Sequence, residues 1–318
     1  MEIFSVNIPL LKSLVSLATV IEAKDPYTGG HTWRVSRYAR LLAEDIGLRQ
    51  DEVFIVHFGS LMHDIGKVSV PDPILNKETK LTNVEYDIMK KHPETGLMLI
   101  RDHPLGALTL DIVASHHERF DGGGYPRGLA GNNISLFARI VAIADAFDAM
   151  TSARPYQRGM PAEIAYQLMA QESARQFDPL LLSAFLNLGR RGDLDHILGH
   201  SSDERLMHSC SVCGPIIVIP SRWQKGDQVV CPKCLGNYDV HPDGGDFEIE
   251  WDRTVNPAWI PQPDIDTINE VAIYAPRELR LSSHFLELSS RPLQTIPSLK
   301  TWSRLFMARS FFNDDIAK

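Results

Sequence analysis

Residues 134–150, with the sequence ISLFARIVAIADAFDAM, form the most apolar helical stretch of the chain. Apolar residues recur there at steps of three and four, which is the spacing of one face of an α-helix. Two earlier stripes have the same spacing, one formed by Leu11, Leu14, Val15, Ala18 and Ile21, the other by Val35, Tyr38, Ala39, Leu42 and Ile46. We therefore expect residues 8–189 to be almost entirely helical, with residues 134–150 the most deeply buried.

The remaining helices are predicted from the same spacing and from residues that start or end helices. Gly47 follows the second stripe and is placed to end its helix, and Asp51 is a suitable N-cap for the next helix. We expect helices over residues 51–62, 82–100, 105–117, 161–172 and 178–188. No alternation of strands and helices interrupts them, so the predicted fold class is mainly α, with an all-α bundle of about six to eight helices.

The character of the sequence changes near Gly189, where a polar stretch with several glycines begins. Short β-branched runs follow at residues 216–219 and 228–230, and they predict strands. Beyond residue 252 the chain has several prolines and, at residues 299–312, the spacing of an amphipathic helix. The predicted organisation is a helical domain at 1–189, a linker at 190–204, a small β-rich module at 205–252 and a mixed C-terminal segment of unknown role at 253–318.

The composition fits a soluble protein with more than one domain. The 318 residues are 44% apolar and 23% charged, and no apolar run approaches the roughly 18 residues of a membrane span. Lys and Arg number 32 against 40 Asp and Glu, so the net charge of −8 argues against coating a nucleic-acid backbone. The N-terminus lacks the basic start and unbroken apolar core of a secretory signal. We expect a cytoplasmic protein that binds neither membranes nor nucleic acids.

All four cysteines belong to one C-x2-C-x17-C-x2-C pattern, formed by Cys210, Cys213, Cys231 and Cys234. This spacing is typical of a tetrahedral zinc site, in which each pair forms a tight turn and delivers two thiolates. Gly214 and Gly236 follow the two pairs, and we expect them to give these turns their conformational freedom. A redox C-x-x-C pair is the alternative, but it needs no second pair at this distance. We predict one structural Zn²⁺ in a module that resembles a zinc ribbon and contacts protein rather than nucleic acid.

A second set of ligating side chains is scattered through the helical region and consists of His31, His63, Asp64, His92, His116, His117 and Asp145. Imidazole and carboxylate ligands suit Fe, Mn, Zn, Ni or Co, whereas Ca and Mg prefer oxygen ligands. One ion takes about three to five protein ligands, so the size of the set implies two ions with a shared carboxylate. His57 and His103 lie singly on apolar faces, and we interpret them as ordinary histidines.

The residues around these ligands form longer motifs. HDIGK occupies residues 63–67 and HHERFDGGGYP residues 116–126, with DPYTGGH at 25–31, KKHPETG at 90–96 and ADAFDAMTSARPY at 144–156. Over residues 14–188 the chain resembles the HD-GYP family, a branch of the HD metal-dependent phosphohydrolases whose usual activity is hydrolysis of cyclic di-GMP. The resemblance implies an HD-type helical bundle in which those His and Asp side chains bind the metals and Asp64 bridges them.

Two positions depart from the family pattern. Family members with three metals carry Glu four residues before the first His, where this chain has Tyr27. A phenol is a poor substitute for a carboxylate ligand, so we predict two metals, with Fe or Mn favoured. The family also tends to have a basic residue directly after RPY, where this chain has Gln157 and then Arg158. Substrate binding at that corner therefore differs from the family pattern.

The expected mechanism follows from phosphodiester chemistry. Two ions about 3.5–4 Å apart can hold a bridging hydroxide, because metal binding lowers the pKa of water to about 7. We expect it to attack phosphorus in line with the departing 3′ oxygen, with Asp64 and Lys67 as the catalytic residues. Lys67 is predicted to contact a nonbridging phosphate oxygen, and the alternative is a solvated charge at a helix end. The predicted substrate contacts are Lys67, Gly123, Gly124, Tyr125, Pro126, Arg154 and Arg158.

We predict a phosphodiesterase that opens cyclic di-GMP to pGpG and, in a further step, to GMP. One alternative is an enzyme for another cyclic dinucleotide such as cyclic GMP-AMP, because the sequence does not separate guanine from adenine selectivity. Another is a non-catalytic sensor that signals through the zinc ribbon, although a pure receptor needs no hydroxide generator. The resemblance also implies association of the loop at 121–126 with GGDEF synthase domains.

Overall fold

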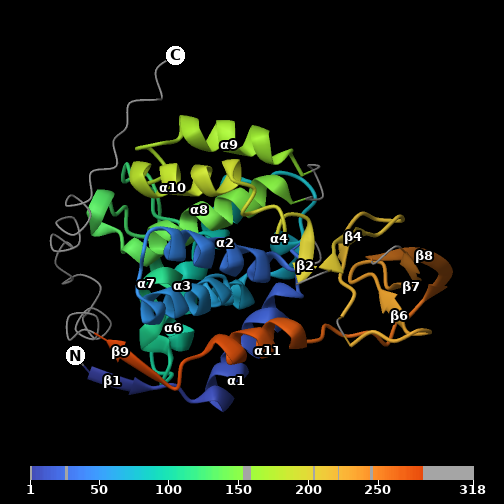
Figure 1. Cartoon of the computed structure of the whole chain (residues 1–318). Coiled ribbons are helices and arrows are strands. Elements are labelled where there is room, and N and C mark those ends of the chain that lie inside the picture. Colours follow the sequence, from blue (N-terminus) through green and yellow to red (C-terminus); the bar gives the residue numbers. More distant parts are fainter. Residues whose placement is uncertain are drawn as a thin grey trace.

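The structure is a computed structural model that describes residues 2–25, 28–152, 159–202, 205–220, 222–243 and 246–281. A helical body makes up most of it, and a smaller β-rich lobe lies at one side (Figure 1). The helices are α1 (Ile8–Glu22), α2 (His31–Asp45), α3 (Gln50–Met62), α4 (Asp72–Leu75), α5 (Asn83–Met89), α6 (His92–Ile100), α7 (Leu110–Ser115), α8 (Leu136–Thr151), α9 (Ala162–Gln171), α10 (Pro179–Arg190) and α11 (Ile265–Tyr274). Short 3₁₀ turns lie at η1 (Ile65–Ser69), η2 (Gly106–Leu108) and η3 (Gly131–Asn133). The predicted mainly α fold class is confirmed.

The predicted apolar stripes form the centre of the helical body. The stripe on α1 is buried along its whole length, and so is the α2 stripe as far as Leu42. In α8 the ring of Phe147 packs against Tyr38 of α2 and Phe185 of α10, with centroids 5.1 and 5.2 Å apart. It also stacks on Tyr166 of α9 at 5.1 Å. Helices distant in sequence are therefore held around α8, as its apolar sequence predicts.

The stretch at 82–100, predicted as one helix, is two helices, α5 and α6. Pro93 explains the break, because its ring would clash with the carbonyl group four residues earlier and it has no N–H to donate. The stretch at 105–117 is likewise divided into η2 and α7. As a result His92 begins a helix instead of lying inside a long one, and His116 directly follows the end of α7. The predicted bundle of six to eight helices is in fact one of ten, counting the described α-helices as far as residue 190.

The predicted cap of α3 is also wrong by two residues. Arg49 is the N-cap, and its backbone N–H donates to Oε2 of Glu52 at 3.0 Å. Asp51 lies inside the first helical turn. A carboxylate three residues after the cap can satisfy the free N–H of the cap, and Glu52 does so here, whereas Asp51 does not cap the helix.

The β-rich lobe is built from short antiparallel strands. β4 (His208–Ser209) pairs with β5 (Ile216–Ile217), and β6 (Gln228–Val230), β7 (Gly236–Asp243) and β8 (Asp246–Val255) form one sheet in that order. β5 is shorter than the predicted run at 216–219, whereas β6 matches its prediction. β2 (His200–Ser202) and β3 (Arg205–Leu206) form a separate pair beside the helical body.

The chain returns from this lobe to the helical body. β9 (Glu278–Leu281) pairs antiparallel with β1 (Glu2–Ser5), and α11 lies along α1 (Figure 1). Ile268 and Val271 of α11 and Leu279 of β9 are buried in the main core. Glu270 accepts hydrogen bonds from Trp33 and Arg37 of α2, each at 2.7 Å. The C-terminal segment, which had no predicted role, thus covers the outer faces of α1 and α2 as far as residue 281.

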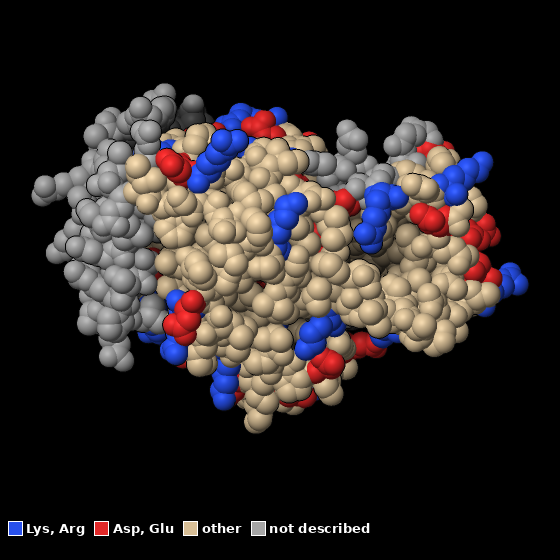
Figure 2. Space-filling model, turned by 90° about the horizontal axis from the view of Figure 1, so that it is seen from below, with Lys and Arg blue, Asp and Glu red and all other residues tan. Residues whose placement is uncertain are grey.

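The predicted linker also contributes to the main core, through buried Leu194 and Ile197. The division into domains at 189, 204 and 252 stays a prediction. The helix expected at 299–312 lies outside the described residues. In the part of the chain that the structure covers, no helix has the length and apolar character needed to cross a bilayer. On the face seen in Figure 2, Lys and Arg side chains lie scattered among Asp and Glu rather than forming one basic surface.

Candidate metal centre

Helix ends bring the predicted metal ligands together. His31 and His92 begin α2 and α6, whereas His63 and His116 directly follow α3 and α7. Asp145 projects from α8. The side chains form two groups, in each of which the ligand atoms lie within 4.8 Å of one another: His31, His63 and Asp145 in one, and Asp64, His92, His116 and His117 in the other.

Asp64 faces both groups, with a different oxygen toward each. Its Oδ2 lies 3.3 Å from Nε2 of His63 and 3.8 Å from Nε2 of His31. Its Oδ1 lies 3.3 Å from Nε2 of His92 and 3.9 Å from Nε2 of His116. A carboxylate in this position can bind two cations, one through each oxygen.

The other ring nitrogen of four histidines is held by a hydrogen-bond acceptor. Nδ1 of His31 contacts Oδ2 of Asp148 at 2.7 Å, and Nδ1 of His63 contacts the Ser60 carbonyl at 2.6 Å. Nδ1 of His92 and of His116 likewise face backbone carbonyl groups of the preceding turn, at 2.9 and 3.1 Å. An acceptor at Nδ1 fixes the proton there, so in the neutral ring Nε2 has a free lone pair that points into the site.

Among the described residues, several of these inward-facing atoms lack a hydrogen-bond donor or acceptor that matches them. Nε2 of His63 and Oδ1 of Asp64 are buried without a hydrogen bond. Nε2 of His92 and Nε2 of His116 lie 3.2 Å apart, so their two lone pairs face each other. Unpaired buried polar atoms are costly, and facing lone pairs repel, unless a cation lies between them. The residues present therefore fit bound metal ions.

The titration behaviour of the centre follows from burial and close charges. Burial lowers the pKa of His117 to about 3, which keeps this ring neutral, as a metal ligand must be. Burial also opposes protonation of His63, but Asp64 and then Asp145 outweigh it and raise its pKa to about 9, so a metal that binds Nε2 would displace a proton. For Asp64, burial is outweighed by Lys67 and His63, which hold its pKa well below the usual range. Asp64 is therefore an anion at neutral pH.

Lys67 lies at the edge of the centre. Its Nζ is 2.6 Å from Oδ2 of Asp64, and its side chain is 22% exposed. The 3₁₀ turn η1, rather than an α-helical turn, carries it. The ammonium group therefore has access both to the shared carboxylate and to solvent.

Gly66 and Gly124 have close backbone neighbours. A Cβ atom on Gly66 would lie 1.8 Å from the carbonyl oxygen of His92, so the glycine lets η1 pack on the start of α6. This contact brings Asp64 close to His92 and is made to protein backbone, not to a ligand. A Cβ atom on Gly124 would lie 2.3 Å from the backbone nitrogen of Arg119. The loop at 121–126 is therefore folded tightly against the segment that follows His117.

This loop places an aromatic ring beside the centre. Tyr125 stacks on His117 with centroids 4.8 Å apart and an angle of 29°. Glu118 supports the loop, because its carboxylate accepts the N–H groups of Arg127 and Leu129 at 2.8 and 2.9 Å. Gly123 is exposed and Pro126 is half-buried. The loop thus holds the ring of Tyr125 against the candidate ligand His117.

The predicted substrate contacts Arg154 and Arg158 lie outside the described part of the chain, and so do Tyr27 and Gln157, where the sequence departs from the family pattern. Sequence reasoning missed Asp148, a buried residue that binds His31, and Arg34, which binds Asp148 with Nε at 2.5 Å and Nη2 at 3.1 Å. The spacing of Asp145 and Asp148 could have indicated Asp148, because residues three apart on a helix lie on the same face.

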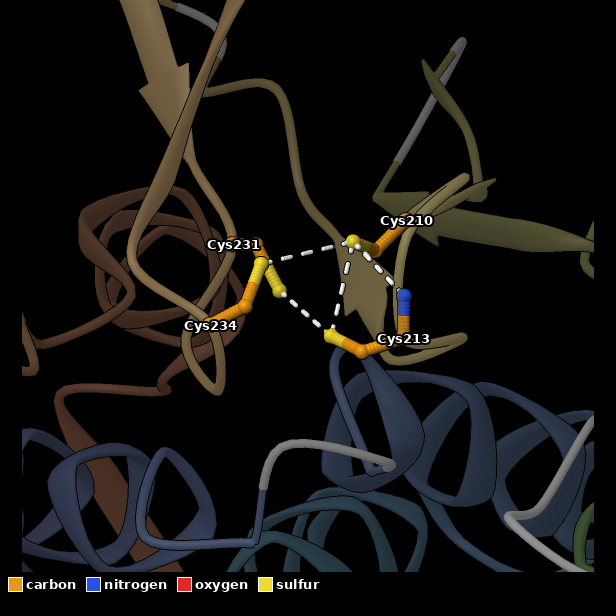
Figure 3. Close-up of side chains that lie close together, drawn as sticks. All are labelled: Cys210, Cys213, Cys231 and Cys234. Carbon is orange, nitrogen blue, oxygen red and sulfur yellow. Dashed lines mark hydrogen bonds between the residues drawn. The ribbon is translucent and has the colours of Figure 1, made fainter. Parts of the chain in front are cut away.

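The four cysteines converge in the β-rich lobe, as Figure 3 shows. Sγ of Cys210 lies 3.5 Å from that of Cys213 and 3.7 Å from that of Cys234, and Cys213 lies 3.6 Å from Cys231. A zinc ion bound by thiolates at about 2.3 Å in tetrahedral geometry holds its sulfurs about 3.8 Å apart, whereas a disulfide needs about 2 Å. The four sulfurs therefore match the spacing of a metal site and not of disulfides.

The turns after the two cysteine pairs differ. Gly214 has φ +90°, as expected of a glycine there. After the second pair Leu235, not Gly236, adopts the left-handed conformation, with φ +59°. The prediction for Gly236 is thus wrong. Gly236 instead lies close to a side chain, because a Cβ atom on it would lie 3.1 Å from Nε1 of Trp251 and the indole would have to shift slightly.

Comparison with known proteins agrees with this geometry. The cyclic di-GMP phosphodiesterase response regulator RpfG of Xanthomonas campestris is 42% identical over 196 residues, covering 60% of this chain and 50% of that protein. A cyclic di-GMP phosphodiesterase of Thermotoga maritima is 37% identical over 202 residues, covering 63% and 54%. The 3′3′-cGAMP-specific phosphodiesterase 2 of Vibrio cholerae is 41% identical over 179 residues, covering 55% and 34%. The chain spans about half the length of the first two relatives and about a third of the last.

The family model of the HD domain matches residues 16–181. The match contains all the clustered His and Asp ligands and ends before the cysteine module. The predicted resemblance is thus confirmed for the helical body and does not extend to the ribbon. The HD domain model covers more than half of the 318 residues of the chain, so the chain belongs to the HD domain family.

Proposed function

We propose that the chain is a metal-dependent phosphodiesterase that hydrolyses cyclic di-GMP to pGpG and, in a further step, to GMP. The observation that carries this proposal is the position of Asp64, whose two oxygens face different ligand groups. A site for two neighbouring cations can stabilise both the attacking and the leaving oxygen of an in-line displacement at phosphorus. The names of two relatives as cyclic di-GMP phosphodiesterases support the substrate.

His31, His63 and Asp145 would hold one ion, His92, His116 and His117 the other, and Asp64 would bind both. When bound, the ions supply positive charge to the phosphate and make a water molecule more acidic. The Nδ1 hydrogen bonds of the histidines keep Nε2 directed inward, and Lys67 is placed to neutralise a nonbridging phosphate oxygen. Tyr125 offers a ring beside His117 against which a base can stack.

We propose Fe or Mn for this centre, because mixed imidazole and carboxylate ligands suit these ions. For the cysteine site we propose one structural Zn²⁺, on the basis of the sulfur separations. Arg154 and Arg158 as substrate contacts, and a GGDEF-type protein partner, stay predictions.

Purified protein with Mn²⁺ or Fe(II) under reducing conditions tests the activity. Cyclic di-GMP should be converted to pGpG and GMP, followed by chromatography. The double variant His63→Ala with Asp64→Ala should lose turnover and bound metal, whereas Lys91→Ala, an exposed change next to His92, should keep both. No turnover in the metal-loaded protein would refute the proposed activity.

A second candidate substrate is 3′3′-cyclic GMP-AMP, because one relative is named as specific for it. The same assay with both cyclic dinucleotides separates the two. Higher kcat/KM for cyclic GMP-AMP would replace cyclic di-GMP as the substrate and leave the metal chemistry unchanged.

A further inference from the structure

Arg34 connects the segment that leads into the β-rich lobe to a candidate metal ligand. It is 1% exposed, and its Nε and Nη2 bind Asp148, which in turn binds Nδ1 of His31. Its Nη1 donates to the carbonyl groups of Gly29 and His200 at 3.1 and 3.0 Å, and lies 2.8 Å from Sδ of Met207. One guanidinium thus joins the α8 carboxylate that orients His31 to the segment leading into the cysteine module.

The turn before His31 also rests on this module. A Cβ atom on Gly29 would lie 3.0 Å from Cγ2 of Ile216 and 3.1 Å from Cγ2 of Val218. A Cβ atom on Gly30, the N-cap of α2, would lie 2.7 Å from Cα of Ser201. The backbone that carries His31 therefore contacts the lobe through Gly29 and the preceding strand β2 through Gly30.

These contacts lead directly to the cysteines. Ile216 pairs with Ser209, the residue before Cys210, and the N–H of Cys210 donates to the carbonyl of Pro215 at 2.8 Å. The buried core of the lobe is small and includes two of the ligands: Cys210, Ile217, Ile219, Val229, Cys231, Tyr238 and Val240. A core of this size depends on a bound metal for its stability.

The lobe is otherwise partly separated from the helical body. A cavity of about 520 Å³ lies between them, lined by residues of α1, of the Gly29–Gly30 turn, of the lobe and of the segment that leads into α11. Figure 2 shows the recess between the two parts on the face seen there. The contacts at Gly29, Gly30 and Arg34 are therefore important, because they attach the lobe to the part of the helical body that carries His31.

We propose that the cysteine module positions His31, so that zinc bound by the four cysteines raises the affinity of the HD-type centre for its metals. Arg34 is the positioning residue through which the module acts, together with the Gly29–Gly30 turn. Loss of zinc would release β4 and β5, free the turn and leave His31 held by Asp148 alone. Outer contacts of metal ligands typically change metal affinity by about 10- to 100-fold.

The test is a titration with Mn²⁺ alone, followed by the electron paramagnetic resonance signal of the free ion. The starting protein is the full chain, chelated mildly so that one zinc per chain remains. Cys213→Ser with Cys234→Ser should remove that zinc and weaken Mn²⁺ binding about tenfold or more. Lys225→Ala, an exposed change in the same module, should change neither. Hydrogen exchange in α3 and α8 shows whether the helical body remains folded.

Arg34→Lys supplies the second arm of the experiment. A single ammonium keeps the charge opposite Asp148 but cannot also reach His200 and Met207, so zinc should stay bound while Mn²⁺ affinity falls. Combined with the cysteine changes, Arg34→Lys should cause no further loss. Zinc-free protein that binds Mn²⁺ within twofold of the parent would overturn the proposal. It would also be overturned if the loss of Mn²⁺ affinity in the combined variant equalled the product of the losses in the two separate variants. Because no nucleotide is present, failure to hydrolyse cyclic dinucleotides would refute only the proposed function on which this inference rests.

Discussion

Gly66 shows how one missing side chain fixes the distance between two candidate ligands. Gly66→Ala would force η1 away from α6, because the new methyl group meets backbone and not a flexible side chain. We expect Asp64 and His92 to separate and Mn²⁺ binding to fall by at least about tenfold, with a cost in stability of about 1–3 kcal/mol. Titration with Mn²⁺ and urea unfolding measure both effects. Unchanged Mn²⁺ affinity would show that the close contact does not position the ligands.

His57 is a buried histidine outside the metal centre, and its burial predicts how the free energy of unfolding changes with pH. Burial lowers its pKa to about 3, although the Ser36 carbonyl lies near Nδ1. The unfolded chain, with a pKa of about 6.5, therefore binds a proton that the folded chain rejects as the pH falls from 6.5 toward 3. Above pH 6.5 this residue therefore costs no free energy of unfolding, and at pH 5 it lowers the free energy of unfolding by about 2 kcal/mol.

In His57→Leu this titration is absent. The difference in unfolding free energy between the variant and the parent should therefore shift by about 2 kcal/mol in favour of the variant between pH 7 and pH 5. Urea unfolding at the two pH values measures it. A difference that does not change with pH would contradict the assignment of a neutral His57.

At the scale of elements, the N-cap residues of two helices differ in the contacts that they make outside their own helix. Asn7 caps α1 with an exposed side chain that accepts the N–H of Leu10 at 3.1 Å. Asp178 caps α10, accepting the N–H of Leu180 at 2.9 Å, and also pairs with Arg139 of α8. Both partners of that ion pair are nearly buried, so removing one leaves a buried charge without its partner.

Asp178→Ala should therefore destabilise the protein by about 3–5 kcal/mol, whereas Asn7→Ala should cost about 1 kcal/mol. Chemical unfolding followed by circular dichroism compares the two variants. Equal losses would show that Asp178 acts as a cap only and that the contact with α8 contributes little.

At the scale of the whole molecule, the last described segment closes the helical body. Val271 on the inner face of α11 is fully buried, whereas Ile273 on the same helix is 79% exposed. Val271→Asp should destabilise the helical body by more than about 3 kcal/mol, because it buries a charge without a partner. Ile273→Asp should change stability by no more than about 0.5 kcal/mol. Thermal unfolding distinguishes them, and equal midpoints would mean that α11 does not pack on α1 in solution.

The sequence by itself determined the helical character of residues 8–189, the apolar faces of α1, α2 and α8, and the identity of the clustered His, Asp and Cys side chains. Periodicity, ligand type and motif spacing are local properties, so they can be seen without a structure. The sequence did not reveal the break between α5 and α6 in spite of Pro93, or Leu235 in the left-handed conformation. These depend on how a segment is packed as much as on its composition.

Only the tertiary structure decided which oxygen of Asp64 faces which histidines, that Asp148 and Arg34 stand behind His31, and that the cysteine module rests on Gly29 and Gly30. These contacts join residues separated by up to 189 positions, between Gly29 and Val218. No periodic pattern encodes such distances, because they arise when helix ends and loops are brought together around a shared core. The physical reason is that the type of ligand is a property of each residue, whereas the geometry of the ligand set depends on how the whole chain packs.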